Sequence, residues 1–261
     1  AIMNPFVVLW RKEWTEAVRT SKIVWLPAVF AILGLMQPVS MKFMPDILQA
    51  AGSLPEGTVI RIPLPQPGEV LGQTLSQFGT IGLLAVCLAY MGTIGGERRS
   101  GTAAWIMVKP VPPLAYAISK WAAAALVTVA AYAIGYACAW YETAVLIGPV
   151  DAGMALASGA AFGGWLLFVL TGVLAAGAWL NAPAAAAFIP FVAATVLQLL
   201  QGLAPSRWMQ ALPSALSASA SASLHTGAPL SVASASVTTI AALAGLLWFT
   251  VWGIRSRPIR G

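Results

Sequence analysis

Charged side chains gather in one short segment of this sequence, which reads GGERRSGTAAWIMVKPVPP over residues 95–113. Glu97, Arg98 and Arg99 follow one another directly, and Lys109 stands before a cluster of prolines. A carboxylate beside guanidinium groups can form charge-assisted hydrogen bonds within a chain or across an interface. We therefore expect this segment to dock another protein, with Glu97 and Arg99 paired to each other or to charged groups of that partner.

Residue patterns typical of enzyme sites are absent from the sequence. It contains neither a GxxxxGK[ST] phosphate-binding loop nor an HExxH zinc motif. The single histidine, His225, stands in a Ser/Ala-rich stretch and has no His or Cys neighbour at metal-ligand spacing. We therefore expect no catalytic residue, no metal site and no enzyme activity in this chain.

The composition is that of an integral membrane protein. Hydrophobic residues make up 59% of the 261 residues and charged residues only 8%, whereas soluble domains carry about 25% charged residues. The net charge of +6 does not point to nucleic acid, because the basic residues fall between apolar runs and are better explained by orientation in a bilayer. We expect the lipid bilayer, and no nucleic acid, as a partner.

Charge-free runs predict an all-α, polytopic fold. A helix needs about 20 apolar residues to cross a bilayer, and the runs allow six such helices in a single transmembrane domain, 1–261. Asn181 and Pro183 favour a tight turn between the fourth and fifth spans. The expected spans are 23–41, 70–95, 115–141, 153–180, 183–204 and 231–254.

The N-terminal segment 5–22 is predicted to be an amphipathic helix. Its apolar residues recur at three- and four-residue spacing with charges between them, the pattern of a helix that lies in the membrane interface. Trp10, Arg11 and Trp14 are its candidate contact residues. The helix either anchors the first span alone or also touches a cytoplasmic partner.

Two segments are expected on the opposite side of the membrane. The proline-rich segment 42–70 predicts an extended outer loop, with room for a short strand at 58–62. The segment 205–230 is rich in Ser and Ala. This composition is compatible with a short re-entrant or surface helix and with a flexible loop.

Basic residues give the expected orientation. Three of the 14 Lys and Arg residues, Lys42, Arg61 and Arg207, fall on the outer side. The other side holds both termini and is predicted to be cytoplasmic, because Lys and Arg concentrate there in membrane proteins. Its basic residues are Arg11, Lys12, Arg19, Lys22, Arg98, Arg99, Lys109, Lys120, Arg255, Arg257 and Arg260.

Uncharged polar residues mark two spans. Gln73, Gln77 and Thr80 are expected to share one face of the second span, and Gln198 and Gln201 lie close together in the fifth. They either line a translocation pathway or form hydrogen bonds between helices, each worth about 0.6 kcal/mol in membranes.

The segment after the second span also supports a family resemblance. The residues ERRSGT at 97–102, followed by Lys109-Pro110 and the third span, resemble the signature of ABC transporter permeases of the type-two exporter superfamily. Glu97, Arg99 and the Gly101-Thr102 pair match the signature, and Arg98 occupies a variable position. In that family the signature lies in the cytoplasmic loop that couples to the ATPase.

The apolar residues after the signature also suit docking. Thr102 can cap a short helix through 103–108, whose apolar Trp105 would otherwise be exposed in a solvated loop. The resemblance and this pattern together make the segment 96–114 the expected cytoplasmic coupling segment. Its candidate residues are Glu97, Arg98, Arg99, Gly101, Thr102 and Trp105.

The resemblance implies a permease subunit that forms the pathway of an exporter in a bacterial cell membrane. A cytoplasmic ABC ATPase dimer would be the partner and would bind ATP and Mg, so no cofactor is expected in this chain. A second permease copy, identical or related, would complete the pathway. Replacing Glu97 and Arg99 together is predicted to uncouple ATP hydrolysis from transport while the protein stays inserted.

Two other functions fit the same composition. One is a secondary transporter, although mid-span ionisable residues, which mark ion pathways, are missing from the sequence. The other is a membrane anchor or sensor subunit that recruits a cytoplasmic protein without moving a solute.

Overall fold

A computed structural model describes residues 5–50, 65–100, 112–203, 206 and 208–256 of the chain. This part is helical and contains no strand. Six helices are long and apolar enough to span a membrane, as the sequence predicts. The helices are α1 (Pro5–Arg19), α2 (Lys22–Ala50), α3 (Pro67–Gln77), the π-helical turn η1 (Phe78–Gly82), α4 (Leu83–Tyr90), α5 (Gly95–Arg99), α7 (Pro113–Leu146), α8 (Ala152–Trp179), α9 (Pro183–Leu203), the 3₁₀ turn η2 (Met209–Ala211), α10 (Ser214–Thr226) and α11 (Ala233–Ser256).

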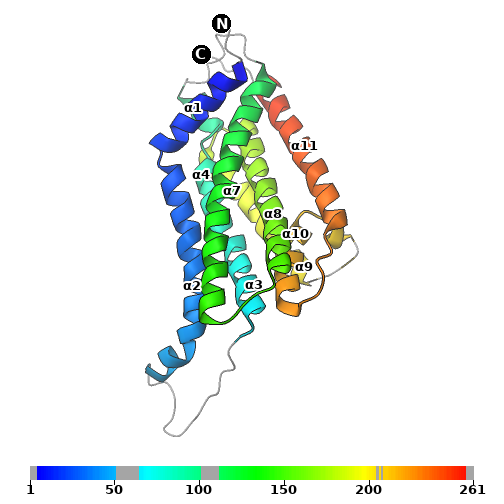
Figure 1. The fold of residues 1–261 in the computed structure, drawn as a ribbon. Coiled ribbons are helices and arrows are strands. Elements are labelled where there is room, and N and C mark those ends of the chain that lie inside the picture. The colour runs from blue at the N-terminus through cyan, green and yellow to red at the C-terminus, as the bar shows by residue number, and fades with distance from the viewer. Residues whose placement is uncertain (1–4, 51–64, 101–111, 204–205, 207, 257–261) are drawn as a thin grey trace.

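The spans form a bundle with inner and outer members, and α1 and the last turn of α11 lie at one end of it (Figure 1). We call this the terminal end. In α7, α8 and the α3–α4 span, between 56% and 61% of the most apolar part is buried, but in α2, α9 and α11 only 17% to 28% is. The outer three therefore present most of their apolar surface to lipid or to another protein.

Aromatic rings hold the inner helices together. Phe78 in η1 meets Phe30 of α2 edge-on at a centroid distance of 5.1 Å and Tyr132 of α7 at 5.9 Å. The Tyr132 hydroxyl donates to the carbonyl of Gly159 in α8 at 2.9 Å. Aromatic pairs stabilise the packing beyond the area that they bury, and the hydrogen bond satisfies the hydroxyl of a buried tyrosine.

Glycines let α2 and α7 approach closely. A Cβ added at Gly135 would lie 2.5 Å from the Phe30 carbonyl oxygen, and one added at Gly34 would collide with the Gly135 carbonyl. Small residues at such contacts bring two backbones together, which maximises dispersion contacts in a membrane.

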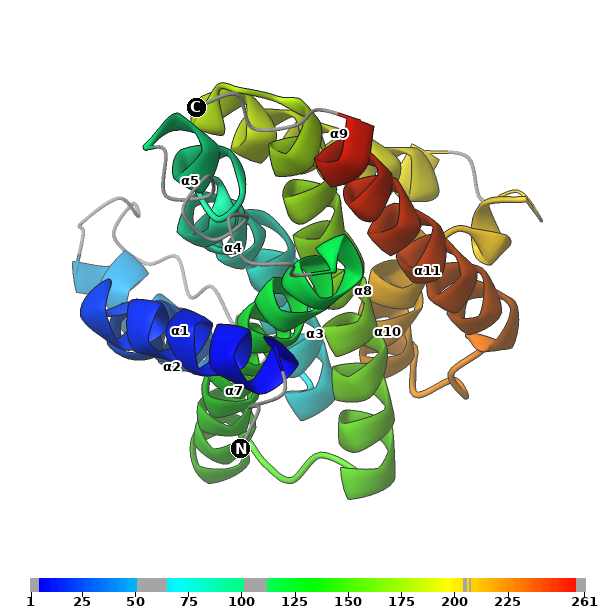
Figure 2. The ribbon, with the colours of Figure 1, turned by 90° about the horizontal axis from the view of Figure 1, so that it is seen from above.

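Helix α1 lies across the terminal end, over α2 and α7 (Figure 2). Ser21, with φ of 55°, makes the turn into α2. Leu9 of α1 is buried, while Val7 and Trp14 are exposed. The predicted amphipathic helix is confirmed, although it ends at Arg19 instead of residue 22.

Several predicted boundaries are wrong. Helix α2 continues through Lys42 to Ala50, and α7 continues past Glu142 to Leu146, because a charge ends an apolar run without ending helical hydrogen bonding. Helices therefore occupy both ends of the expected outer loop 42–70, at residues 42–50 and 67–70. Its expected strand at 58–62 lies outside the described residues.

The second span also differs from the expected uninterrupted helix 70–95. It begins as α3, passes through the π turn η1, and ends as α4 at Tyr90. A π turn takes more residues per turn than an α-helix. Residues after Gln77 are therefore rotated relative to those before it.

The segment 205–230 contains a helix where it is described. Helix α10 packs on α3 and α8 (Figure 1). Leu216 near its start contacts Gly164, about midway along α8, and Leu224 near its end contacts Gly68 at the start of α3. The helix therefore runs inside the bundle from middle depth toward the end opposite the termini. This supports the re-entrant alternative over the flexible loop.

Candidate functional site

The candidate site lies at the terminal end, where α5 meets α1 and α7. Four residues after α4, the chain forms the five-residue helix α5, which carries Glu97, Arg98 and Arg99. Gly95 lets this helix sit against the end of α8, since an added Cβ would lie 3.2 Å from the Leu180 carbonyl oxygen. The helix that carries the charged triplet thus packs against the end of α8 at its first residue, Gly95.

Glu97 points inward. Its side chain is 9% exposed, and its Oε1 is 2.9 Å from Nζ of Lys120 in α7. The same oxygen accepts a hydrogen bond from Nζ of Lys12 in α1, and Oε2 accepts one from the hydroxyl of Tyr116 in α7. The Glu97 carboxylate thus pairs with lysines of this chain instead of with Arg99, and a contact with a partner protein stays a prediction.

Lys120 connects the same site to a second carboxylate. Its Nζ donates to Oε1 of Glu13 in α1 at 2.8 Å, and its side chain is fully buried. Lys12 Nζ also lies 3.0 Å from Glu13 Oε1 and 3.4 Å from Glu16 Oε2. We call these five residues, Lys12, Glu13, Glu16, Glu97 and Lys120, the ionic network.

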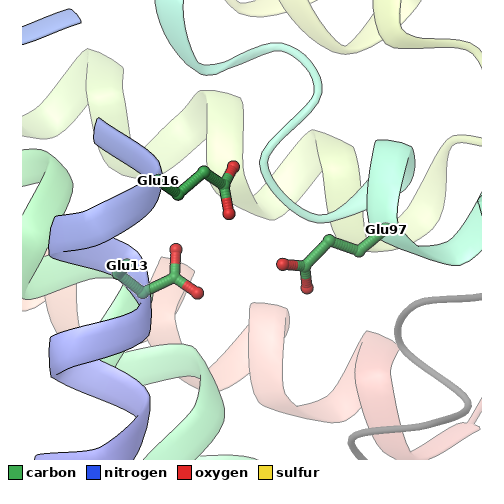
Figure 3. Close-up of side chains that lie close together, drawn as sticks. All are labelled: Glu13, Glu16 and Glu97. Atoms are coloured by element: carbon green, nitrogen blue, oxygen red, sulfur yellow. The ribbon is translucent and has the colours of Figure 1, made fainter. Parts of the chain in front are cut away.

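The carboxylates of the network converge from two elements (Figure 3). Glu13 and Glu16 come from α1 and Glu97 from α5, with an oxygen of each within 4.8 Å of the others. This spacing resembles that of a cation site. The positive charge is supplied by the lysines, however, because Lys12 pairs with all three carboxylates and Lys120 with two of them. The arrangement is a salt-bridge cluster.

The carboxylates keep Lys12 charged. Burial lowers the pKa of Lys12, but Glu13 and Glu97 raise it by more, so the pKa lies above that of a free lysine. Lys22 adds a third cation beside the network, in a small cavity that Glu13, Glu16 and Lys120 also line. Three acidic and three basic side chains thus balance in one place.

Arg98 reaches the other side of the bundle. Its guanidinium donates to the carbonyl of Ala178 in α8 at 2.6 Å and to that of Gly253 in α11 at 3.1 Å. Both carbonyls lie in the last turn of their helices, where acceptors lack intrahelical donors and the helix dipole favours a cation. Neighbouring side chains of α5 therefore fasten four helices: Glu97 holds α1 and α7, and Arg98 holds α8 and α11.

Other predicted contact residues lie on the surface or outside the described residues. Arg99 of α5 and Arg11 of α1 are exposed, Trp14 is 40% exposed and Trp10 is half-buried. These side chains are accessible to a partner or to the membrane surface. Gly101, Thr102 and Trp105, with the helix expected at 103–108, lie outside the described residues.

The predicted pathway residues divide between two places. Gln73 accepts a hydrogen bond from Gln37 of α2 at 2.8 Å, whereas Thr80 lines a cavity of about 290 Å³ between α3, η1, α9 and α10. Gln77 is half-buried, and its Oε1 has no hydrogen-bond partner among the described residues. Gln73 and Thr80 thus have different surroundings, since Gln73 bonds to α2 and Thr80 lines the cavity beside α9.

Gln198 and Gln201 join α9 to α10. Gln198 lines the cavity, and with its amide turned so that both ends are satisfied it donates to the Gly79 carbonyl at 3.1 Å and accepts from Trp165 Nε1 at 2.9 Å. Gln201 donates to Ser214 Oγ at 3.0 Å. These contacts are the hydrogen bonds between helices that were the alternative to pathway lining.

Sequence reasoning missed most of the ionic network. It placed Lys12 and Lys120 among the charges of the terminal side and gave Glu13 and Tyr116 no role. One signal was available: Lys120 falls inside the predicted third span 115–141, where an ionisable side chain requires a partner.

The comparisons with known proteins agree with a membrane-spanning chain. No model of a known protein family matches the sequence. Over 173 residues it is 35% identical to the uncharacterized transmembrane protein YxlG of Bacillus subtilis (strain 168). The similarity covers 66% of this chain and 67% of that protein. The chain therefore belongs to the same family of transmembrane proteins as YxlG.

Proposed function

We propose that this chain is the permease subunit of an ABC transporter and that a separate ATPase drives it through α5. The observation that carries the proposal is the position of α5, whose adjacent Glu97 and Arg98 bond to four different helices. A force applied to α5 would reach α1, α7, α8 and α11 at once. Such a joint suits a protein that receives mechanical work from outside the membrane.

Exposed residues near α5 are available to bind an ATPase. Arg99 and Arg11 are exposed beside the buried network, and the residues that follow α5 carry the rest of the ERRSGT signature. Arg99 is the group that we assign to the partner contact. Glu97 then acts from inside, as the residue that passes movement of α5 to α1 and α7.

The proposed orientation places the terminal end in the cytoplasm of a bacterial cell. The predicted excess of Lys and Arg supports this. Arg11, Arg19, Arg99 and Arg255 are all exposed there. An ATPase in the cytoplasm would meet α1 and α5 directly in this orientation.

The proposed pathway lies beside α9, which is the least buried span, with 17% of its most apolar part covered. Next to it opens the cavity lined by Thr80 and Gln198, with further hydroxyls from Ser76 and Ser217. Polar groups exposed at this depth are unfavourable against lipid. A second permease copy facing this side would enclose them, and the two cavities would then form one polar route for an exported solute.

Co-purification with the native ATPase tests this proposal. A tagged chain would be extracted from native membranes in mild detergent, and cytoplasmic proteins retained at equal stoichiometry identified. We expect an ABC ATPase, and we expect Arg99→Ala to reduce its recovery several-fold. The matched control is Arg19→Ala, which removes an exposed arginine from the same end but away from α5.

The outcome also separates the alternatives. A stoichiometric cytoplasmic protein without ATPase activity would favour an anchor or sensor subunit. Solute movement by the purified chain in vesicles without any ATPase would favour a secondary transporter. Equal recovery of the ATPase with Arg99→Ala and with the unchanged chain would show that Arg99 is not part of the interface.

The double replacement of Glu97 and Arg99, which the sequence suggests as a test of coupling, tests the ATPase interface less specifically than Arg99→Ala does. Removing the Glu97 carboxylate leaves the fully buried Lys120 with one carboxylate fewer, so the variant would lose stability as well as coupling. Arg99 alone is exposed, and its replacement reports on the interface.

A further inference from the structure

A groove of about 520 Å³ opens between α7 and α11 at the terminal end, on a different side of the bundle from the α9 cavity. Leu114 and Ile118 of α7 form one wall, and Leu247 and Val251 of α11 form the other. Its volume lies within the range of about 300–1,000 Å³ that is typical of ligand pockets. Its lining is almost entirely apolar apart from Arg255.

The tryptophans of the groove are held in place by neighbouring rings. Trp252 meets Trp179 of α8 edge-on at 4.9 Å, and Trp179 stacks on Phe249 at 4.8 Å. Trp248 stacks on Trp252 at 6.0 Å and is 68% exposed. A wall fixed in this way loses little conformational freedom when a ligand binds.

Arg255 lies at the mouth of the groove, one helical turn beyond Trp252. It is exposed, and none of the described carboxylates forms an ion pair with it. A guanidinium group binds phosphate through two parallel hydrogen bonds. The site thus combines an apolar channel with a phosphate-binding group at one end.

We propose that this groove binds one anionic phospholipid, with an acyl chain between α7 and α11 and the phosphate on Arg255. The groove runs along α11 from Ala244 to Arg255, which is about 16 Å at the helical rise of about 1.5 Å per residue. This matches half of the roughly 30 Å hydrocarbon core, the depth that one leaflet supplies. Basic pockets between spans are recognised sites for anionic headgroups.

A second copy of the chain fits this groove less well than a lipid. Two copies related by an axis along the membrane normal would present their Arg255 side chains at the same depth, and like charges facing each other are unfavourable. An anionic headgroup neutralises the same arginine. The proposal does not depend on the transport function, because it concerns a different face and needs no ATPase.

Native mass spectrometry of the purified chain tests this inference. The detergent-solubilised protein would be titrated with dioleoylphosphatidylglycerol and, separately, with dioleoylphosphatidylcholine. We expect one phosphatidylglycerol to bind about fivefold more tightly than phosphatidylcholine, since one basic side chain near an anionic surface contributes about that preference. Arg255→Gln should abolish the preference and Arg255→Lys should keep most of it.

Two further variants make the result specific. Arg19→Gln removes an equal charge from the same end outside the groove and should leave the preference unchanged. Ala244→Phe fills the groove at an exposed position and should reduce the tight binding of both lipids.

Three results would overturn the proposal. They are equal binding of the two lipids by the unchanged chain, an undiminished preference in Arg255→Gln, and undiminished binding in Ala244→Phe. Disulfide cross-linking of Ala244→Cys chains in native membranes, above the level of the unchanged chain, would assign the groove to a second copy instead.

Discussion

The two polar regions of this protein are built from different interactions. At the terminal end, Glu97 and Lys120 are buried charges held 2.9 Å apart. In the cavity beside α9, Gln198 and Ser217 are uncharged groups joined by ordinary hydrogen bonds. Breaking a buried ion pair by removing one partner costs about 3–5 kcal/mol, whereas a hydrogen bond between membrane helices contributes about 0.6 kcal/mol.

This difference separates a rigid region from an adaptable one. The ionic network and Arg98 bind α1, α5, α7, α8 and α11 together at one end. The cavity lies between α3, α9 and α10, and α9 is little buried. We expect the terminal end to move as one piece and α9 to change position against it.

Replacing Lys120 should have the largest effect on stability. Lys120→Met leaves Glu13 and Glu97 short of their buried counter-charge, so the free energy of unfolding should fall by about 3–5 kcal/mol. Unfolding by sodium dodecyl sulfate in mixed micelles measures this. Arg99→Gln serves as the control, because Arg99 is exposed and surface substitutions change stability by less than about 0.5 kcal/mol. Equal stability of the two variants would refute the ionic network.

Replacing Arg98 should have an intermediate effect. Arg98→Gln removes the cation from the last carbonyls of α8 and α11, and hydrogen bonds from a charged donor of this kind are worth about 2 kcal/mol. The same unfolding assay measures the loss. A loss as large as that of Lys120→Met would mean that Arg98 also supports the network on the other side of α5.

Replacing Gln198 should have the smallest effect on stability. Gln198→Leu removes the hydrogen bonds to Gly79, Trp165 and Ser217, for a loss of about 1.8 kcal/mol at the membrane value of about 0.6 kcal/mol each. If the cavity is the pathway, the same variant should nevertheless change export by intact cells. Gln73→Leu is the matched control, since Gln73 bonds to Gln37 away from the cavity. Equal changes in export from both variants would count against the proposed pathway.

Apolar run length predicts the spans of this fold well. Each of the six expected spans is helical, and the turn at Asn181 and Pro183 lies between α8 and α9 as expected. Exact helix ends are harder to predict, because α2 and α7 continue beyond Lys42 and Glu142. A charged residue marks where the chain leaves the hydrocarbon core, but the helix can continue beyond it because the backbone hydrogen bonds are unaffected.

The candidate site was predicted in part. The sequence pattern singled out Glu97 and Arg98, but their partners lie far away in the chain, with Lys12 separated from Glu97 by 85 residues. No local spacing rule relates such residues. The π turn η1 has no sequence signature of its own either, so the separation of Gln73 from Thr80 followed only from the structure.

The coupling between Glu97 and Lys120 is the most direct test of the ionic network, on which the proposed role of α5 depends. A double-mutant cycle with Glu97→Gln and Lys120→Met, read as free energies of unfolding in mixed micelles, isolates their interaction. The network predicts that the double variant is about 2 kcal/mol more stable than the sum of the single losses implies. Losses that add within about 0.5 kcal/mol would show that the two side chains do not interact, and α5 would then have no fixed connection to α7 through Glu97.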